Sequence, residues 1–413
     1  MTYKKPELLI PASSLEVLKT AVMFGADAVY IGGEAFGLRA KAKNFSSEEM
    51  AEGVAFAHAH GVKVYVTANI LAHNYDLDGA RKYFAELRDM KPEQPDALII
   101  SDPGMFMIAK EVWPQVEVHI STQANNTNYE TYLFWWKLGA KRVVSARELS
   151  LAEIKGIREK IPAEMEIESF VHGAMCISYS GRCLLSNFFT GRDANRGACT
   201  HPCRWKYAVV EETRPGEYLP VYENERGTYI FNSKDLCMIE HIPELIKAGI
   251  DSFKIEGRNK TAYYTACVTG AYRAAVDAYL ADPEHYVMPQ FCLDEVNKVS
   301  HREYYTGFYF GPSANGQHYG DSQYIRDYEV VGMPVDCRED GTAVFALKNR
   351  FFKGEELELL QPGHAPYSFH AEAVNDDGEA LDLFNVPQMK VHFQFPFAVD
   401  RYAILRKKKE RPE

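Results

Sequence analysis

The chain has 413 residues, of which 46% are hydrophobic and 25% are charged, a composition ordinary for a globular protein. Its formal net charge of −11 argues against a broad nucleic-acid-binding surface, because such surfaces rely on Lys and Arg to release counterions from phosphates. It contains no apolar run of the roughly 20 residues that cross a bilayer, and no signal-peptide pattern precedes the first predicted strand, so we expect a cytoplasmic protein without membrane contact.

Over roughly the first 260 residues, short apolar runs alternate with amphipathic stretches. The continuous aliphatic runs predict buried strands, and the stretches between them show helical spacing, with Ser caps and Gly stops. Eight buried strands joined by helical crossovers indicate a (β/α)8 barrel of the TIM type. A doubly wound sheet is the alternative, but no G-x-G-x-x-G follows the first strand to favour it. The predicted strands are residues 7–13, 28–33, 62–70, 96–102, 116–124, 142–149, 166–173 and 249–258.

Beyond about residue 325 the pattern changes to short strands separated by Gly, Asp-Gly and Pro turns. We therefore predict two domains, a barrel over residues 1–325 and a small all-β, barrel-like domain over residues 326–413. Residues 174–248 form a long insertion between the seventh and eighth barrel strands. Insertions that follow a barrel strand lie at its carboxyl end, where active sites of this fold are built.

Polar residues at the carboxyl ends of the predicted strands are candidates for this active site. Several Arg and Lys side chains converging on one barrel mouth suggest a small anionic ligand, since guanidinium groups grip carboxylates. The alternative is an internal salt-bridge network, which would pair Arg147 with Glu168 or Lys254 with Glu256. The candidate ligand-binding residues are Arg39, Asn69, Gln123, Arg147, Lys254, Glu256 and Arg258, and Glu168 and His172 are candidate catalytic groups by location only.

Half of the chain's eight cysteines lie between residues 176 and 203, in the first part of the insertion, in the pattern C-x6-C-x15-C-x3-C. A reducing compartment argues against structural disulfides, and a catalytic thiol gives no reason for four cysteines. Four thiolates in a polar loop fit a tetrahedral zinc site or an iron–sulfur cluster, and the spacing alone does not separate the two. The predicted ligands are Cys176, Cys183, Cys199 and Cys203, with Cys237 as a possible substitute.

The segment "ESFVHGAMCISYSGRCLLS" (residues 168–186) resembles the signature of the U32 family, which is catalogued as a peptidase family. It matches E-x-F-x2-G-[SA]-[LIVM]-C-x4-G-x-C-x-[LIVM]-S at every defined position. Further similar segments, such as "GADAVYIGG", "HISTQAN", "DSFKIEGR" and "KNRFFKGEELELL", extend the resemblance over essentially the whole chain. Within the family, the chain is most similar to the prephenate-dependent tRNA uridine hydroxylases.

This resemblance implies an oxygen-independent hydroxylase that forms 5-hydroxyuridine at wobble position 34 of tRNA, with prephenate as co-substrate. It also implies a 4Fe–4S cluster held by the four insertion cysteines, of which Cys203 is the least certain because some relatives use a cysteine matching Cys237. Prephenate is a dicarboxylate, which suits the basic side chains predicted at the barrel mouth. The rival interpretations are a peptidase, a hydroxylase of ribosomal RNA or a quinone precursor, and a non-enzymatic partner of such a hydroxylase. No H-E-x-x-H or G-x-S-x-G motif supports the peptidase.

An acidic chain that binds tRNA needs a local basic face. We expect this face around the arginines of the insertion, with a contribution from the second domain, and we expect an extruded base to stack on nearby aromatic rings. The oligomeric state cannot be derived from the sequence. The expected basic residues are Arg182, Arg192, Arg196, Arg204, Lys348, Arg350 and Lys353, and the expected stacking residues are Trp205 and Tyr207.

Overall fold

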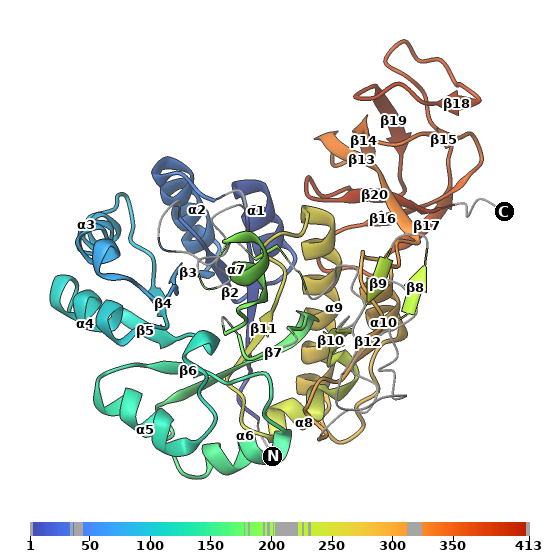
Figure 1. Ribbon diagram of the computed structural model, residues 1–413. Coiled ribbons are helices and arrows are strands. Elements are labelled where there is room, and N and C mark those ends of the chain that lie inside the picture. The colour runs from blue at the N-terminus through green and yellow to red at the C-terminus, as the bar shows by residue number, and fades with distance from the viewer. Residues whose placement is uncertain are drawn as a thin grey trace. The chain divides into compact units, whose positions relative to one another are not determined.

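A computed structural model of the protein describes most of the chain in two compact units (Figure 1). The first unit comprises residues 1–22, 26–260 and 302–324, and the second comprises residues 23–25, 261–301 and 325–413. The described residues are 3–33, 36, 44–176, 178–180, 182–192, 195, 199–200, 202, 222–224, 227–229, 233–311 and 324–409.

Within the described part of the first unit, eight parallel strands close into a barrel. Strands β1 to β7 follow one another around the ring, and β11 pairs with both β7 and β1 to close it. This confirms the predicted (β/α)8 architecture, with all eight strands inside or close to the predicted ranges. The strands are β1 (Glu7–Pro11), β2 (Ala28–Ile31), β3 (Lys63–Ala68), β4 (Ala97–Ile100), β5 (Glu117–Ile120), β6 (Arg142–Val144), β7 (Glu166–Ala174) and β11 (Ser252–Ile255).

Helices α2 to α6 lie on the outer side of the strands (Figure 1). Their starts are fixed by local side-chain caps: at α2 the Ser46 hydroxyl accepts from the Glu49 N–H, and the Glu49 carboxylate accepts from the Ser46 N–H. No helix among the described residues is both long and apolar enough to cross a bilayer. The helices of this region are α1 (Leu15–Met23), α2 (Ser47–Ala59), α3 (Leu77–Arg88), α4 (Pro103–Val112), α5 (Tyr129–Lys137), α6 (Leu151–Arg158) and α8 (Ile242–Lys247), with short 3-10 turns η1 (Asn74–Asp76), η2 (Thr122–Ala124) and η5 (Ile239–His241).

Two short strands extend the barrel sheet beyond β7, one in the insertion between β7 and β11 and one later in the chain. Strand β10 (Asp235–Cys237) pairs antiparallel with the last residues of β7, and β12 (Tyr304–Tyr305) pairs parallel with β10. The sequence did not predict this extension, because three-residue strands carry too little periodicity to be recognised. The insertion also contains the short helix α7 (Leu185–Thr190) and the hairpin of β8 (Tyr222–Asn224) and β9 (Gly227–Tyr229).

The second unit contains helices α9 (Ala262–Ala281) and α10 (Gln290–Asn297) and an antiparallel sheet in the order β17-β16-β20-β13-β14-β19. A separate pair of short strands, β15 and β18, packs its Phe351 and Phe384 rings in a stack. This confirms the predicted C-terminal all-β domain. Its strands are β13 (Tyr328–Cys337), β14 (Thr342–Leu347), β15 (Phe351–Phe352), β16 (Glu356–Leu360), β17 (Tyr367–His370), β18 (Leu383–Phe384), β19 (Lys390–Gln394) and β20 (Ile404–Lys408).

The interior of the barrel contains a buried ion network in addition to its apolar core. The Arg142 guanidinium, which is 3% exposed, lies 2.5 Å from the Glu7 carboxylate and 2.6 Å from that of Glu166. The Tyr65 hydroxyl donates to Glu7 at 2.6 Å. Burial by itself would raise the pKa of Glu7, but Arg142 and the Tyr65 hydrogen bond outweigh it and lower the pKa to about 2.

This shift predicts how Glu7 affects acid stability. Because the pKa falls on folding from 4.5 to about 2, ionised Glu7 stabilises the fold fully above pH 4.5, and this contribution is lost as the pH falls towards 2. The shift corresponds to about 3 kcal/mol at pH 7, of which roughly 2 kcal/mol disappears by pH 3. We therefore expect Glu7→Gln to be about 3 kcal/mol less stable than the parent at pH 7 but only about 1 kcal/mol less stable at pH 3. Urea unfolding at both pH values measures this, and an equal difference at the two pH values would contradict it.

Candidate active site at the carboxyl end of the barrel

A second buried ion pair lies one step further along the barrel interior. The Lys254 ammonium of β11 is 2.6 Å from Glu168 of β7, and Glu168 also receives Arg142 at 3.2 Å. Lys254 and Glu168 are 4% and 0% exposed. The sequence suggested the ion pairs Arg147–Glu168 and Lys254–Glu256, and neither is formed. Glu168 pairs with both Lys254 and Arg142 instead.

The charge state of Glu168 follows from these neighbours. Burial would raise the pKa of this carboxyl, but the Coulomb attraction of Lys254 and Arg142 outweighs it, so its pKa is lowered. Glu168 is therefore ionised at neutral pH, which argues against a general-acid role for this candidate catalytic residue.

Two aromatic rings surround the Lys254 ammonium. Its Nζ atom lies 4.4 Å from the centre of the Tyr30 ring and 5.4 Å from that of Phe170, distances at which a cation is attracted to the ring face. The Phe170 ring has a second cation beside it as well, because the Arg147 guanidinium lies 4.7 Å from its centre. Phe170 thus separates two cations, and together these side chains form the floor of the barrel mouth.

Amide and hydroxyl groups join the ends of β3, β4 and β5. The Asn69 side-chain amide donates to the Ser121 hydroxyl at 3.3 Å and to the Gln123 amide oxygen at 3.2 Å. The Asn69 carbonyl accepts from the Ser101 hydroxyl at 2.8 Å. The structure therefore brings the two candidates Asn69 and Gln123 together in one hydrogen-bonded group.

Arg258, which follows β11, reaches across to the ends of β2 and β3. It is 5% exposed, and its guanidinium donates to the Thr67 hydroxyl at 3.0 Å and to the Asn44 amide oxygen at 3.3 Å. The guanidinium lies directly over Gly32, where a Cβ atom would come within 2.2 Å of Nη2. Glycine at this position therefore makes the space that Arg258 occupies.

Arg147, which follows β6, is held by neutral groups. Its guanidinium donates to the Ala174 carbonyl at 2.8 Å and to the Ser180 hydroxyl at 3.3 Å. Among the described side chains, no carboxylate lies within ion-pair distance of Arg147. Its positive charge is thus positioned at the mouth without a direct counter-charge, as a binding site for an anion requires.

The remaining two candidates lie where β7 and β11 meet. The His172 ring is 1% exposed and packs 5.3 Å from the Tyr304 ring, while its carbonyl accepts from the Glu256 N–H at 2.8 Å. The Glu256 carboxylate accepts from the Tyr30 hydroxyl at 3.5 Å. Gly173 has a φ of 107°, and a Cβ there would lie 2.5 Å from the Glu256 carbonyl oxygen, so this close approach requires the glycine of the signature.

Two contacts fasten the insertion to the barrel mouth. One is the Arg147–Ser180 hydrogen bond. In the other, the Asn195 amide accepts from the Leu71 N–H at 3.0 Å and donates to the Leu71 carbonyl at 3.2 Å, which ties Asn195 to the loop after β3. Within the insertion, the Ser186 hydroxyl of α7 accepts from the Thr200 N–H at 3.0 Å. The insertion therefore lies over the carboxyl end of the barrel, as the sequence predicts.

Where the structure describes them, the cysteines of the insertion are not joined in disulfides. Cys176 is exposed, and Cys183 and Cys199 are half-buried. The Ser186–Thr200 hydrogen bond holds the residue after Cys199 against the helix that begins two residues after Cys183. Over the described ranges, no three His, Cys, Asp or Glu side chains are grouped so as to hold a metal ion, and Cys203 lies outside those ranges. The alternative ligand Cys237 lies in β10, opposite His172 in the sheet.

Several predicted residues lie outside the described part of the chain or on its surface. Arg39, Arg196, Arg204, Trp205 and Tyr207 are outside the described residues. Arg182 and Arg192 are exposed on either side of α7, and Lys348, Arg350 and Lys353 are exposed in and next to the turn between β14 and β15.

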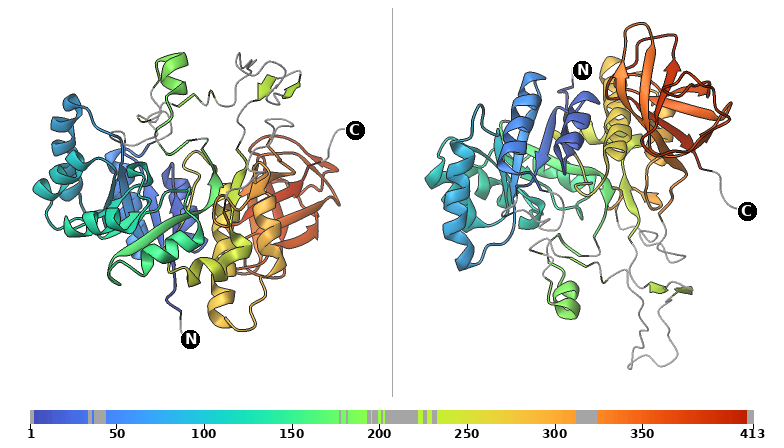
Figure 2. Two further views of the ribbon diagram at one scale, coloured as in Figure 1. Left: turned by 60° about the horizontal axis from the view of Figure 1, so that its bottom comes forward. Right: turned by 90° about the horizontal axis from the view of Figure 1, so that it is seen from above.

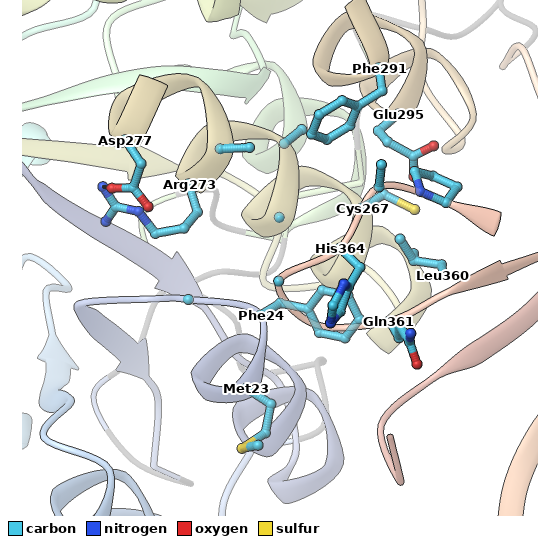
Figure 3. A pocket seen from close by; sticks show the side chains of 17 residues that line it. Met23, Phe24, Cys267, Arg273, Asp277, Phe291, Glu295, Leu360, Gln361 and His364 are labelled. Carbon is cyan, nitrogen blue, oxygen red and sulfur yellow. Dashed lines mark ion pairs between the residues drawn. The ribbon is translucent and has the colours of Figure 1, made fainter. Parts of the chain in front are cut away.

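A separate cavity of about 240 Å³ lies within the second unit (Figure 3). It is lined mainly by apolar side chains, such as Phe24 and Phe291, and the Arg273–Asp277 ion pair lies along α9 at its edge. None of the residues predicted for the active site lines this cavity.

The family of the chain follows from comparison with known proteins. The family model described as peptidase family U32 matches residues 13–318, and the model of the U32 C-terminal domain matches residues 326–406. The chain belongs to peptidase family U32. Three residues of the family signature make structural contacts in this member. Glu168 pairs with Lys254, Phe170 lies between two cations, and Gly173 permits the contact of β7 with β11.

Several curated proteins are similar to this U32 member. It is 43% identical to tRNA hydroxylation protein P1 of Bacillus subtilis over 98% of this chain and 96% of that protein. It is 40% identical to tRNA hydroxylation protein P of Escherichia coli over 92% of this chain and 91% of that protein. It is also 38% identical to the 23S rRNA 5-hydroxycytidine C2501 synthase of Escherichia coli, over 67% of this chain but 40% of that protein.

Sequence reasoning did not identify several residues that build the site. Glu7 and Arg142 open apolar strands, and charges at strand starts are usually solvated, so neither was predicted to point into the barrel. Ser180, Asn195 and Thr200 are ordinary loop residues in sequence. The one available signal was the polar composition of the insertion, which does not say which residue each side chain contacts.

The Glu168–Lys254 pair predicts a strong energetic coupling. Glu168→Gln leaves the buried Lys254 ammonium without its carboxylate, and removing one partner of a buried pair costs about 3–5 kcal/mol. We expect the double variant Glu168→Gln/Lys254→Met to recover much of this loss, because no unpaired ammonium remains.

Denaturant unfolding of both single variants and the double variant measures the coupling. A matched control is Glu52→Gln, which breaks an exposed pair with Lys19 at a similar 2.7 Å and should leave stability unchanged within error. Strictly additive losses for Glu168 and Lys254 would contradict the coupling.

Proposed function

We propose that the protein hydroxylates the wobble uridine of tRNA, with prephenate as co-substrate and an iron–sulfur cluster as cofactor. The similarity to tRNA hydroxylation proteins over nearly the full length of both chains carries this proposal. These relatives and the rRNA hydroxycytidine synthase support an RNA-modifying hydroxylase. Three parts of the proposal go beyond that conclusion. They are the uridine as the modified base, prephenate as the co-substrate and the iron–sulfur cluster as the cofactor.

The barrel mouth supports an anionic co-substrate. Arg147 is fixed there through neutral acceptors, so it keeps donor capacity for a ligand carboxylate, and Arg258 lies at the same end of the barrel, bonded to Thr67 and Asn44. Lys254 is already neutralised by Glu168 at 2.6 Å. We therefore assign one carboxylate of prephenate to Arg147, keep Arg258 as a further candidate by its place at the mouth, and assign Lys254 to the floor, where it holds Glu168 and the Phe170 ring in place.

The insertion supports a metal cofactor. Cys176, Cys183 and Cys199 are unbridged thiols next to the mouth, and thiolates are the usual ligands of an iron–sulfur cluster. In our proposal these three and Cys203 hold the cluster, with Cys237 as the alternative fourth ligand. When bound, such a cluster supplies electron transfer.

Modified nucleosides in tRNA test this function. In a strain that lacks the gene and any paralogue, we expect 5-hydroxyuridine and its derivatives to disappear from total tRNA in mass spectrometry of hydrolysed nucleosides. The parent gene should restore them. An unchanged profile would overturn the proposal, and a loss of hydroxycytidine from ribosomal RNA instead would move the substrate to rRNA. Cleavage of gelatin by the purified protein, abolished by a single substitution, would favour the peptidase named by the family.

Two glycine variants in the same strain test the arginine site. Gly32→Ala places a methyl group where the Arg258 guanidinium lies, so we expect restoration of 5-hydroxyuridine to fall at least tenfold at limiting prephenate. Gly156→Ala in α6 meets no atom within 4 Å and should restore it fully. Equal restoration by both variants would show that the position of Arg258 does not matter.

Cofactor content is tested independently of activity. Protein purified without oxygen should contain iron and acid-labile sulfide, and Cys176→Ser should lose most of both. Cys337→Ser is the matched control, because this half-buried thiol lies in β13 of the second unit. Stoichiometric zinc without sulfide, or full iron content in Cys176→Ser, would contradict the proposed ligand set.

A further inference from the structure

Helix α7 presents large apolar side chains to solvent. Phe188 is 80% exposed and Leu184, just before the helix, is 75% exposed, while Tyr179 and Phe189 are about half exposed. The buried residue of the helix is Ser186, which makes the hydrogen bond to Thr200. Figure 2 shows α7, in green, standing out from the barrel at the end opposite the N-terminus. Apolar side chains gathered at one exposed place usually mark a binding surface.

The charge around α7 is positive although the whole chain is acidic. Arg182 and Arg192 are both exposed, one on each side of the helix. Between Glu168 and Asp193 the sequence contains no acidic residue, whereas the chain as a whole has a net charge of −11. A partner with negative charge and flat apolar faces therefore fits this surface better than an apolar protein face does.

The aromatic rings have the geometry of a stacking platform. The Phe189 ring meets the Phe188 ring nearly edge-on, with centroids 5.2 Å apart and planes at 78°, which supports the orientation of the more exposed ring. The Ser186–Thr200 hydrogen bond ties the helix to the following segment of the insertion, and the Asn195 bonds tie that segment to the loop after β3 at the barrel mouth. A base stacked on Phe188 would therefore lie at the same end of the barrel as the candidate site.

We propose that Tyr179, Arg182, Leu184, Phe188 and Arg192 form a docking surface for the unpaired nucleotides of an RNA loop. Bases stack on the rings, and the two arginines contact the phosphates. This inference rests on the proposed function only in taking RNA as the substrate. It assigns recognition of the single strand to α7 and the residues that flank it. The proposed function gives these side chains no other role.

The test measures RNA binding directly. The probe is a synthetic hairpin RNA with a uridine-containing single-stranded loop, and the reference is a blunt duplex of the same stem. We expect Phe188→Ala to weaken hairpin binding roughly tenfold or more and to leave duplex binding unchanged, because the lost contact is base stacking. Phe188→Trp should retain binding. Phe134→Ala is the matched control, since Phe134 is 52% exposed and also lies edge-on to a neighbouring ring, at 5.1 Å, but on α5.

A second arm tests the phosphate contacts. Arg182→Gln/Arg192→Gln should lower the dependence of hairpin affinity on salt by roughly one to two units in the log–log slope, because two phosphate contacts are lost. An unchanged slope would overturn the assignment of these arginines.

Each outcome separates this surface from the proposed function. Parent-like hairpin binding by Phe188→Ala, with 5-hydroxyuridine lost from the deletion strain, would overturn the surface and leave the function standing. Weakened hairpin binding with an unchanged tRNA profile would support the surface and overturn the function. A change in oligomeric state of Phe188→Ala by light scattering, with RNA binding intact, would mean that α7 contacts another protein chain and would overturn the proposal.

Discussion

The buried ion network inside the barrel is the interaction on which the rest of the site depends. Arg142 joins Glu7 and Glu166 to Glu168, and Glu168 in turn holds Lys254. Charges removed from water are costly unless each finds a partner, so the strands that carry them can be placed in only one register. The network therefore links β1, β6, β7 and β11, the strands at which the ring closes. It also neutralises Lys254, so our proposal assigns the anionic co-substrate to the arginines nearer the mouth and not to this lysine.

A second constraint is the attachment of the insertion. Among its described residues, Ser180 bonds Arg147, Asn195 bonds the Leu71 backbone, and β10 pairs with β7 of the barrel. Arg147 takes part in both regions, because it contacts the Phe170 ring of the floor and the Ser180 hydroxyl of the insertion. The thiols of the insertion, Arg147 and α7 thus share one end of the barrel. An acidic protein can bind RNA in this way, because a short stretch without carboxylates is sufficient where the contact is made.

Much of the fold could be predicted from the sequence. Each barrel strand is a continuous apolar run, and a run of this kind remains recognisable whatever it packs against. The U32 signature could be read as well, since its spacing is local. The contacts that the signature residues make could not be predicted. An ion pair of Glu168 with Arg147 was the one considered, and in the fold Glu168 pairs with Lys254 and Arg142 instead. Partner choice depends on which strands become neighbours, and β7 and β11 are separated by a long insertion.

By itself, the sequence determined the barrel class, the all-β C-terminal domain, the family and the placement of four cysteines in one crossover. These features depend on local periodicity and spacing, which survive without knowledge of the partner. Only the tertiary structure decided that Glu7 and Arg142 point inward, that Gly32 makes room for Arg258, and that α7 leaves Phe188 in solvent. These are properties of residues far apart in the chain, and they exist only once the ring of strands has closed.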